Sequence, residues 1–228
     1  MTTTKKITVL LAEDHAIVRQ GLCALLKADG GFDLVGEART GREAVELARA
    51  LKPEVILMDI AMPVLNGLEA TKQVLTANPA ARILILSAHS DDEYIERMIA
   101  AGVAGFLEKQ TSADVLAKAI REVAKGHQYF TASIARRLGA RAGKPRDRDG
   151  LLKANGKRLT ARECEVLQMV AEGSANKQIA AELGISIKTV EKHRQHLMDK
   201  LDIHDTAGLT RYAISAGFIE SVVQVTIE

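Results

Sequence analysis

Five polar side chains stand where four short apolar runs of this sequence end. Glu13 and Asp14 close the first run, and Asp59, Ser87 and Lys109 each close one of the others. In a parallel sheet, ligands collect at the carboxyl ends of the strands, so these groups are positioned for binding or chemistry. Three carboxylates brought together repel one another and raise their pKa values unless a divalent cation neutralises them. Because oxygen ligands of this kind suit Mg²⁺, the pattern predicts a magnesium site.

Asp59 taken alone has two interpretations. It is either a reactive group at a strand end or a cap for the loop formed by residues 60–63. The hydroxyl of Ser87 and the ammonium of Lys109 favour the first interpretation. Together with Mg²⁺ they can hold the equatorial oxygens of a phosphoryl group during its transfer to an aspartate nucleophile. We therefore expect Asp59 to accept a phosphoryl group.

These residues resemble the receiver domain of two-component response regulators. The resemblance covers about residues 7–126 and includes Met62-Pro63 and Asn66-Gly67 after the central aspartate. It implies that Asp59 is the phosphoacceptor, with a sensor histidine kinase as the donor. It further implies that Asp14, Asp59 and the backbone carbonyl of Ala61 bind Mg²⁺ directly, and that Glu13 binds it either directly or through water. Ser87 and Lys109 would contact the phosphoryl group, and Phe106 would be the switch aromatic.

The sequence departs from many receivers at positions beside the site. Ala61 and His89 stand where the family's side chains help to position attacking water. Since Ala61 cannot orient water, slow self-hydrolysis of the phosphorylated form is expected. Gln110 follows Lys109, where a proline is common in the family. If the loop needs a cis peptide there, a non-proline residue costs about 3 kcal/mol, so the geometry beside Lys109 stays open.

The elements that must position these groups alternate along the N-terminal half of the chain. Apolar runs predict strands at 7–12, 32–36, 55–59, 82–86 and 105–108, and helical periodicity predicts helices at 15–28, 41–51, 68–77, 92–101 and 113–125, the last with Ser112 as N-cap. Five alternations predict an α/β fold with a parallel sheet covered by helices on both faces. Right-handed crossovers then favour the doubly wound strand order 2-1-3-4-5.

The length and the charge distribution indicate more than one domain. A chain of 228 residues is comfortable for two domains. The net charge is −2 over residues 1–130, +7 over 131–158 and −3 over 159–228. We expect a receiver domain in the first segment, a basic linker in the second and another domain in the third. The linker is either a solvated flexible connection, which we favour, or a tether that associates with DNA.

The third segment has the helix signals of a small all-α domain. Thr160 and Glu163 form a capping-box pattern at the start of a first helix. Asn176 is the expected N-cap of a second helix, and Ser186 that of a third helix ending near Leu201. A fourth helix is expected at 206–216. The tight turn between the second and third helices predicts a helix-turn-helix, whose second member enters the DNA major groove. A helical bundle that binds protein is the alternative.

Residues 159–218 resemble the LuxR-type DNA-binding domain. The resemblance is carried by Leu159-Thr160-x-Arg162-Glu163, Asn176-Lys177-x-Ile179-Ala180, Ile185-Ser186-x-x-Thr189-Val190-x-x-His193 and Lys200-Leu201. Together the two resemblances are those of a response regulator of the NarL/FixJ type. They imply base contacts by Glu191, Lys192 and Gln195, and DNA-backbone contacts by Lys177, Lys188, Thr189, His193 and Arg194.

The expected function is that of a DNA-binding transcription regulator switched by phosphorylation. Its expected partners are double-stranded DNA, the sensor kinase, a second copy of the phosphorylated chain in a homodimer, and RNA polymerase as a further candidate. Two rival functions are considered. A haloacid-dehalogenase-like phosphatase needs a second aspartate two residues after the nucleophile, where this chain has Ala61. The other rival is a DNA-binding protein whose receiver responds to a ligand or a partner instead of phosphorylation.

The cellular setting follows from the cysteines and from hydropathy. Cys23 and Cys164 lie far apart and have no metal-ligand neighbours, so we expect buried thiols in a reducing cytoplasm. The chain shows no signal-peptide core and no apolar run long enough to cross a bilayer. We therefore expect a cytoplasmic protein that is not associated with membranes and is not an enzyme.

Overall fold

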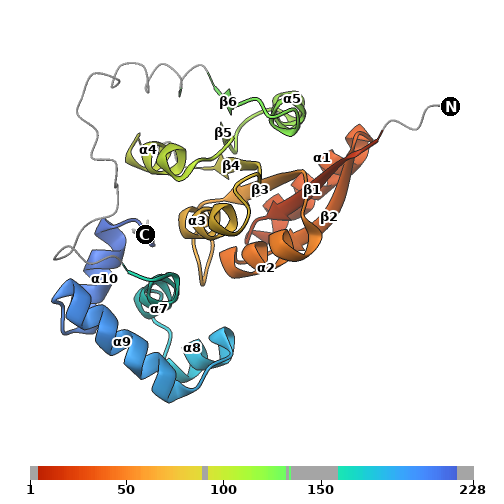
Figure 1. Ribbon diagram of the computed structural model, residues 1–228. Coiled ribbons are helices and arrows are strands. Elements are labelled where there is room, and N and C mark those ends of the chain that lie inside the picture. The colour runs from red at the N-terminus through yellow and green to blue at the C-terminus, as the bar shows by residue number, and fades with distance from the viewer. Residues whose placement is uncertain (1–4, 89–91, 132–133, 135–158, 220–228) are drawn as a thin grey trace, which may run out of the picture. The chain divides into compact units, whose positions relative to one another are not determined.

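The computed structural model describes residues 5–88, 92–131, 134 and 159–219 (Figure 1). The chain divides into two compact units, Met1–Gly150 and Leu151–Glu228. Apart from 131 and 134, the predicted basic linker lies outside the described residues. Within the described parts, none of the helices is both long and apolar enough to cross a membrane.

The N-terminal unit is a parallel sheet in the order β2-β1-β3-β4-β5-β6. Its strands are β1 (Ile7–Ala12), β2 (Phe32–Ala38), β3 (Val55–Asp59), β4 (Ile83–Ser87), β5 (Gly105–Glu108) and β6 (Tyr129–Phe130). The predicted α/β class and the order of the first five strands are confirmed. The sixth strand was not predicted, because two residues are too few to show a period. It pairs with Gly105 and Phe106 at the edge of the sheet.

Helices cover both faces of the sheet and enclose two hydrophobic cores. The helices are α1 (Ala16–Asp29), α2 (Gly41–Leu51), α3 (Gly67–Ala77), α4 (Asp92–Ala101) and α5 (Ala113–Ala124). Alternate residues of the central strands enter opposite cores: Leu10 packs with residues of α2, α3 and α4, whereas Leu11 packs with residues of α1 and α5. Strands buried on both faces are continuously apolar, which explains why the sequence revealed them.

The C-terminal unit is all-helical, as predicted. It consists of α7 (Ala161–Ala171), α8 (Asn176–Leu183), α9 (Ile187–Leu201) and α10 (Thr206–Ser215). The predicted capping box begins α7, since the Thr160 backbone donates to Glu163 Oε2 at 2.7 Å and Thr160 Oγ1 accepts from the Glu163 backbone at 3.3 Å. Gly184, in the left-handed region at φ 62°, ends α8, and Ser186 caps α9.

One of the predicted N-caps is wrong, and another is confirmed in position. Asn176 is not an N-cap but the first residue of α8, and the N-cap position is held by Ala175. Asn176 Oδ1 accepts instead from Arg194 Nη1 on α9 at 2.8 Å, so a tertiary contact has taken the oxygen that local preference assigns to capping. Ser112 does occupy the N-cap position of α5, but its side chain makes no capping hydrogen bond.

Candidate functional site

The register of the sheet brings the predicted site residues to one edge. Ala12 pairs with Met58, Asp59 with Leu86, and Ser87 with Glu108, so the carboxyl ends of β1, β3, β4 and β5 are level. The backbone N–H of Lys109 donates to the carbonyl of Ser87 at 2.8 Å, which holds the β5–α5 loop against the end of β4.

Lys109 links two of the predicted carboxylates. Its Nζ lies 2.8 Å from Glu13 Oε2, 3.0 Å from Glu13 Oε1 and 2.9 Å from Asp59 Oδ2. The side chains of Glu13 and Asp59 are 1% and 3% exposed, so a single ammonium compensates two buried negative charges. The predicted meeting of Glu13, Asp59 and Lys109 at the strand ends is therefore present in the structure.

Burial and the neighbouring charges have opposite effects on the pKa values of Asp59 and Lys109. Burial raises the pKa of Asp59 above its ordinary value, and the ammonium of Lys109 opposes that rise only in part. Burial would lower the pKa of Lys109, but its hydrogen bond to Glu13 and the charge of Asp59 outweigh burial and raise it. Lys109 therefore stays positively charged at neutral pH.

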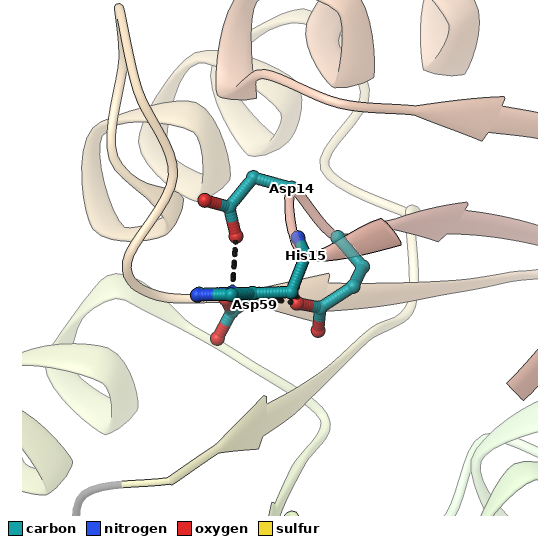
Figure 2. Close-up of side chains that lie close together, drawn as sticks. Asp14, His15 and Asp59 are labelled. Atoms are coloured by element: carbon teal, nitrogen blue, oxygen red, sulfur yellow. Dashed lines mark hydrogen bonds and ion pairs between the residues drawn. The ribbon is translucent and has the colours of Figure 1, made fainter. Parts of the chain in front are cut away.

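His15 and Arg19 also lie at the acidic site, although the sequence did not single them out. His15 Nδ1 is 2.9 Å from Asp14 Oδ1 and 3.3 Å from Glu13 Oε1. Figure 2 shows His15 beside Asp14 and Asp59. Arg19 Nη1 donates to the backbone carbonyls of Glu13 and Asp14 at 2.9 and 3.0 Å. The position of His15 directly after the acidic pair could have identified it from the sequence. Arg19 is near the site only because α1 folds back over the end of β1.

The loop after β3 fixes the position of the Asp59 carboxylate and backbone. Asp59 Oδ1 accepts a hydrogen bond from the Ile60 backbone at 2.8 Å. Gly67 passes so close that a Cβ there would lie 2.0 Å from the Asp59 carbonyl oxygen. Asn66 caps α3 by accepting from the Glu69 backbone at 2.9 Å. The Asn66-Gly67 pair noted in the sequence therefore allows α3 to start directly against the end of β3.

The donor set fits a divalent cation. Glu13 Oε2, Asp14 Oδ1 and Asp59 Oδ2 are buried and accept no hydrogen bond from the described residues, although the first and third lie at ion-pair distance from Lys109 and the second from His15. Three carboxylates and one ammonium leave the cluster net negative. One dication would neutralise that remaining charge.

Of the other residues predicted for the receiver site, Ser87 and Phe106 are among the described residues and His89 is not. Ser87 is 2% exposed at the end of β4, and Phe106 is fully buried in β5. His89, the other residue considered for positioning water, lies outside the described residues. The peptide bonds of the described residues are all trans, so the loop at Gln110 is built without a cis bond.

The predicted DNA contacts of the C-terminal unit fall into two groups. Lys177, Lys188, Glu191, Lys192 and Gln195 are exposed, whereas Thr189, His193 and Arg194 are half-buried. Arg194 donates to Asn176 Oδ1 on α8 and, at 3.2 Å, to Thr206 Oγ1 on α10. It thus ties three helices together.

Two further residues predicted to contact DNA are Gln195, which has a partner within α9, and His193, whose pKa is shifted. Gln195 Nε2 donates to Asp199 Oδ1 at 2.8 Å, one turn along the helix. Burial lowers the pKa of His193, and the nearby cation of Arg162 lowers it further. His193 is therefore neutral at pH 7 and can offer DNA a hydrogen bond but no full charge.

Comparison with known protein families covers both units. Residues 9–121 match the family model "Response regulator receiver domain", and residues 157–213 match "Bacterial regulatory proteins, luxR family". The transcriptional regulatory protein MctR of Rhizobium johnstonii is 38% identical over 97% of this chain and all of MctR. This chain is a response regulator of the luxR family.

Other members of the family extend the comparison. LiaR of Bacillus subtilis is 39% identical over 91% of this response regulator and 96% of LiaR. Among solved structures, the Salmonella typhimurium response regulator RcsB aligns with a TM-score of 0.54 and 26% identity, covering 92% of this chain and 99% of RcsB. RcsB dimers bound to DNA align with a TM-score of 0.56.

One ion pair of the luxR-type unit predicts a pH dependence of this response regulator. Burial would raise the pKa of Glu163, but hydrogen bonds from Lys200 Nζ, at 2.6 Å, and from Thr160 outweigh burial and lower it. A lowered pKa contributes stability that is present above the unfolded value of 4.5 and is lost as pH falls through the folded value. We expect Glu163→Gln to destabilise the unit by about 2 kcal/mol at pH 7, measured by urea denaturation.

The pH profile tests the cause of that loss. The difference in unfolding free energy between wild type and Glu163→Gln should shrink as the pH is lowered from 5 to 3. A difference that stays constant over this range would mean that the Glu163 carboxylate charge is not what stabilises the unit. Glu182→Gln, an exposed change on α8, is the matched control.

Proposed function

We propose that this response regulator is a DNA-binding transcription regulator switched by phosphorylation of Asp59, with Mg²⁺ as cofactor and a sensor histidine kinase as phosphoryl donor. The observation that supports this most directly is the contact of one ammonium, Lys109 Nζ, with the buried carboxylates of Glu13 and Asp59. An aspartate held by a lysine beside two further acids at a strand-end edge is suited to receiving a phosphoryl group.

Each side chain has a distinct role in the proposed transfer. The Asp59 carboxylate attacks phosphorus, and a new P–O bond forms as the bond from phosphorus to the donor breaks. The Ile60 N–H holds Oδ1, and the Lys109 ammonium lies beside Oδ2. Lys109 pairs with a phosphoryl oxygen, and the hydroxyl of Ser87 donates to another. Glu13, Asp14, Asp59 and the carbonyl of Ala61 would hold Mg²⁺, which would supply positive charge beside the transferring group.

The proposed switch passes from Asp59 to the neighbouring strands. Ser87 moves toward the phosphoryl group, and the ring of Phe106 changes rotamer. Because Phe106 is fully buried, its ring cannot turn without repacking its neighbours. The change therefore alters the surface of α4, β5 and α5. The phosphorylated form pairs as a homodimer.

The proposed output is binding to double-stranded DNA through α9 in the major groove. Glu191, Lys192 and Gln195 face bases, while Lys177, Lys188, Thr189 and His193 meet the DNA backbone. We revise the role of Arg194 toward positioning, because both sides of its guanidinium are engaged by α8 and α10. A dimer reads paired half-sites about one helical turn apart. The protein acts in the cytoplasm, with RNA polymerase as a further candidate partner, and it is not an enzyme.

Intact mass after acetyl phosphate treatment tests the receiver half of the proposal. With Mg²⁺ present, wild type is expected to gain the mass of one phosphoryl group, and Asp59→Asn is expected to gain none, since an amide is a poor nucleophile. Omitting Mg²⁺ or adding EDTA should suppress the adduct on wild type. Asp33→Asn, a change at an exposed aspartate of β2, is the matched control and should retain the adduct.

The outcomes separate the rivals. No adduct on wild type would favour a receiver that answers a ligand, and rapid turnover of the donor would favour a phosphatase. Following the adduct after donor removal also measures its lifetime. Complete loss of the adduct within seconds at neutral pH would contradict the slow self-hydrolysis expected from Ala61.

Two lysines of α9 are expected to affect DNA binding differently. Lys192→Ala should weaken operator binding by about 1–3 kcal/mol and alter base preference at one position, because this residue is expected to read bases. Lys188→Ala should weaken binding to all sequences alike and reduce the slope of log affinity against log salt by about 1. Fluorescence anisotropy with selected operators over a range of salt concentrations distinguishes the two effects.

Arg194→Lys provides the control for the revised assignment. Lysine keeps the charge but cannot reach both Asn176 and Thr206 as the planar guanidinium does. Arg194→Lys should lower the thermal stability of the luxR-type unit. Lys188→Ala and Lys192→Ala should have the same melting temperature as wild type. Unchanged stability together with weakened DNA binding would return Arg194 to the backbone contacts.

A further inference from the structure

One large apolar side chain lies on the exposed surface of α9, the helix proposed to enter the major groove. Ile187, the first residue of α9, is 44% exposed. The buried apolar residues of the same helix are Val190, Leu197 and Leu201. Ile187 precedes Val190 by three residues and Glu191 by four. It therefore lies at the border between the buried side of α9 and the side proposed to read bases.

Neither packing nor helix stability explains an isoleucine at this position. A β-branched side chain favours a helix less than alanine, glutamate or lysine does. The first turn of a helix prefers acidic residues, because the helix dipole is positive there. The first turn of α9 contains no acid, but it does contain Lys188, which is exposed. This composition favours contact with an anionic partner over stability of the free helix.

The start of α9 is held in place by local hydrogen bonds. Gly184, at φ 62°, ends α8 directly before the turn that leads to Ile187. Ser186 Oγ accepts from the Thr189 backbone at 3.1 Å and lies 2.8 Å from Thr189 Oγ1. In a helix-turn-helix, residues at the N-terminal end of the second helix contact base edges. Ile187 is therefore held at the end of α9 that approaches the bases.

The major groove offers an isoleucine one kind of partner. Base edges present hydrogen-bond donors and acceptors there, and the C5-methyl group of thymine is the apolar exception. We propose that Ile187 contacts the C5-methyl group of a thymine in each half-site, beside the bases that Glu191 and Lys192 are proposed to read. Thymine is then preferred at that position. This inference rests on the proposed function of α9 in DNA binding.

Uracil substitution isolates the proposed contact, because uracil pairs with adenine as thymine does and lacks only the C5-methyl group. Duplexes are first selected from a random-sequence pool by the full chain treated with acetyl phosphate and Mg²⁺. Each thymine of the selected site is then replaced by uracil, one at a time, and affinity is measured by fluorescence anisotropy. Because burying one carbon group of this size contributes about 0.8 kcal/mol, replacing the contacted thymine should weaken binding of wild type about fourfold.

Variants of Ile187 assign the effect to this side chain. Ile187→Ala should bind the thymine and uracil duplexes equally, whereas Ile187→Val, which keeps two methyl groups, should retain part of the discrimination. Ile214→Ala is the matched control, because Ile214 is 40% exposed on α10, outside the helix-turn-helix. It should discriminate as wild type does. Alanine favours a helix, so Ile187→Ala is expected to fold, and circular dichroism checks this.

The outcomes separate this inference from the proposed function. A fourfold preference for thymine that is lost in Ile187→Ala and kept in Ile214→Ala supports the contact. A selected site in which no uracil substitution weakens binding of wild type overturns it, and so does a preference that persists in Ile187→Ala. Both of these results leave DNA binding by α9 intact. Failure of wild type to enrich any duplex would instead refute the proposed DNA binding, and the thymine contact with it.

Discussion

Lys109→Met is expected to destabilise the receiver unit by about 3–5 kcal/mol in buffer containing EDTA, because it leaves two buried carboxylates without their cation. Lys109 Nζ contacts both Glu13 and Asp59 at 3.0 Å or less, and methionine fills a similar volume without charge. Phosphorylation by acetyl phosphate should also be largely lost, since the phosphoryl oxygen has no ammonium partner. Thermal denaturation and intact mass measure the two effects.

Added Mg²⁺ distinguishes a charge effect from a packing effect. If uncompensated carboxylates cause the loss, Mg²⁺ should raise the melting temperature of Lys109→Met more than that of wild type, because the dication replaces the missing charge. A stability loss that Mg²⁺ does not change would point to packing instead. Lys118→Met on the exposed side of α5 is the matched control and should behave like wild type.

Gly67→Ala is expected to destabilise the receiver unit by about 3 kcal/mol, an effect of overpacking against backbone. The added Cβ would lie 2.0 Å from the Asp59 carbonyl oxygen and 3.0 Å from the Ile60 Cα, and neither atom can rotate away as a side chain could. Either α3 must shift or the end of β3 must move. Because β3 carries Asp59, the rate of phosphorylation should fall together with the melting temperature.

The same substitution elsewhere provides the control. Gly21 lies within α1, and a Cβ there would meet no atom within 4 Å. Since alanine favours a helix interior over glycine by about 1 kcal/mol, Gly21→Ala should stabilise the unit. Opposite signs for the two glycine-to-alanine changes are therefore expected in urea denaturation. A neutral Gly67→Ala would show that the Asn66-Gly67 turn is not held against Asp59.

Much of the receiver fold and site could be predicted because its signals are local. The central strands are buried on both faces, so each appears as an unbroken apolar run, and the polar residue that ends the run marks the edge of the sheet. Parallel strands then align their carboxyl ends, which brought Glu13, Asp59 and Lys109 together as expected. Capping by Thr160 and Ser186 was equally local, since donor and acceptor are three residues apart.

The misses have a different physical origin. β6 exists because its two residues find an open sheet edge beside β5, and a segment of two residues has no periodicity. Arg19 reaches the backbone carbonyls of Glu13 and Asp14 only because α1 packs back over β1. No spacing in the sequence specifies these approaches, because they depend on how whole elements pack.

The sequence by itself determined which groups are available: the acids, the hydroxyl and the lysine at strand ends, and the basic and polar face of α9. The tertiary structure decided how those groups are used. Arg194 on α9 donates hydrogen bonds to Asn176 on α8 and to Thr206 on α10, and the Asn176 side-chain oxygen accepts from Arg194 instead of capping a helix. The backbone N–H of His15 donates to Glu13 Oε1, and this contact holds His15 beside the acidic residues. A polar side chain takes the partner that folding brings nearest, and only local partners can be known before the chain is folded.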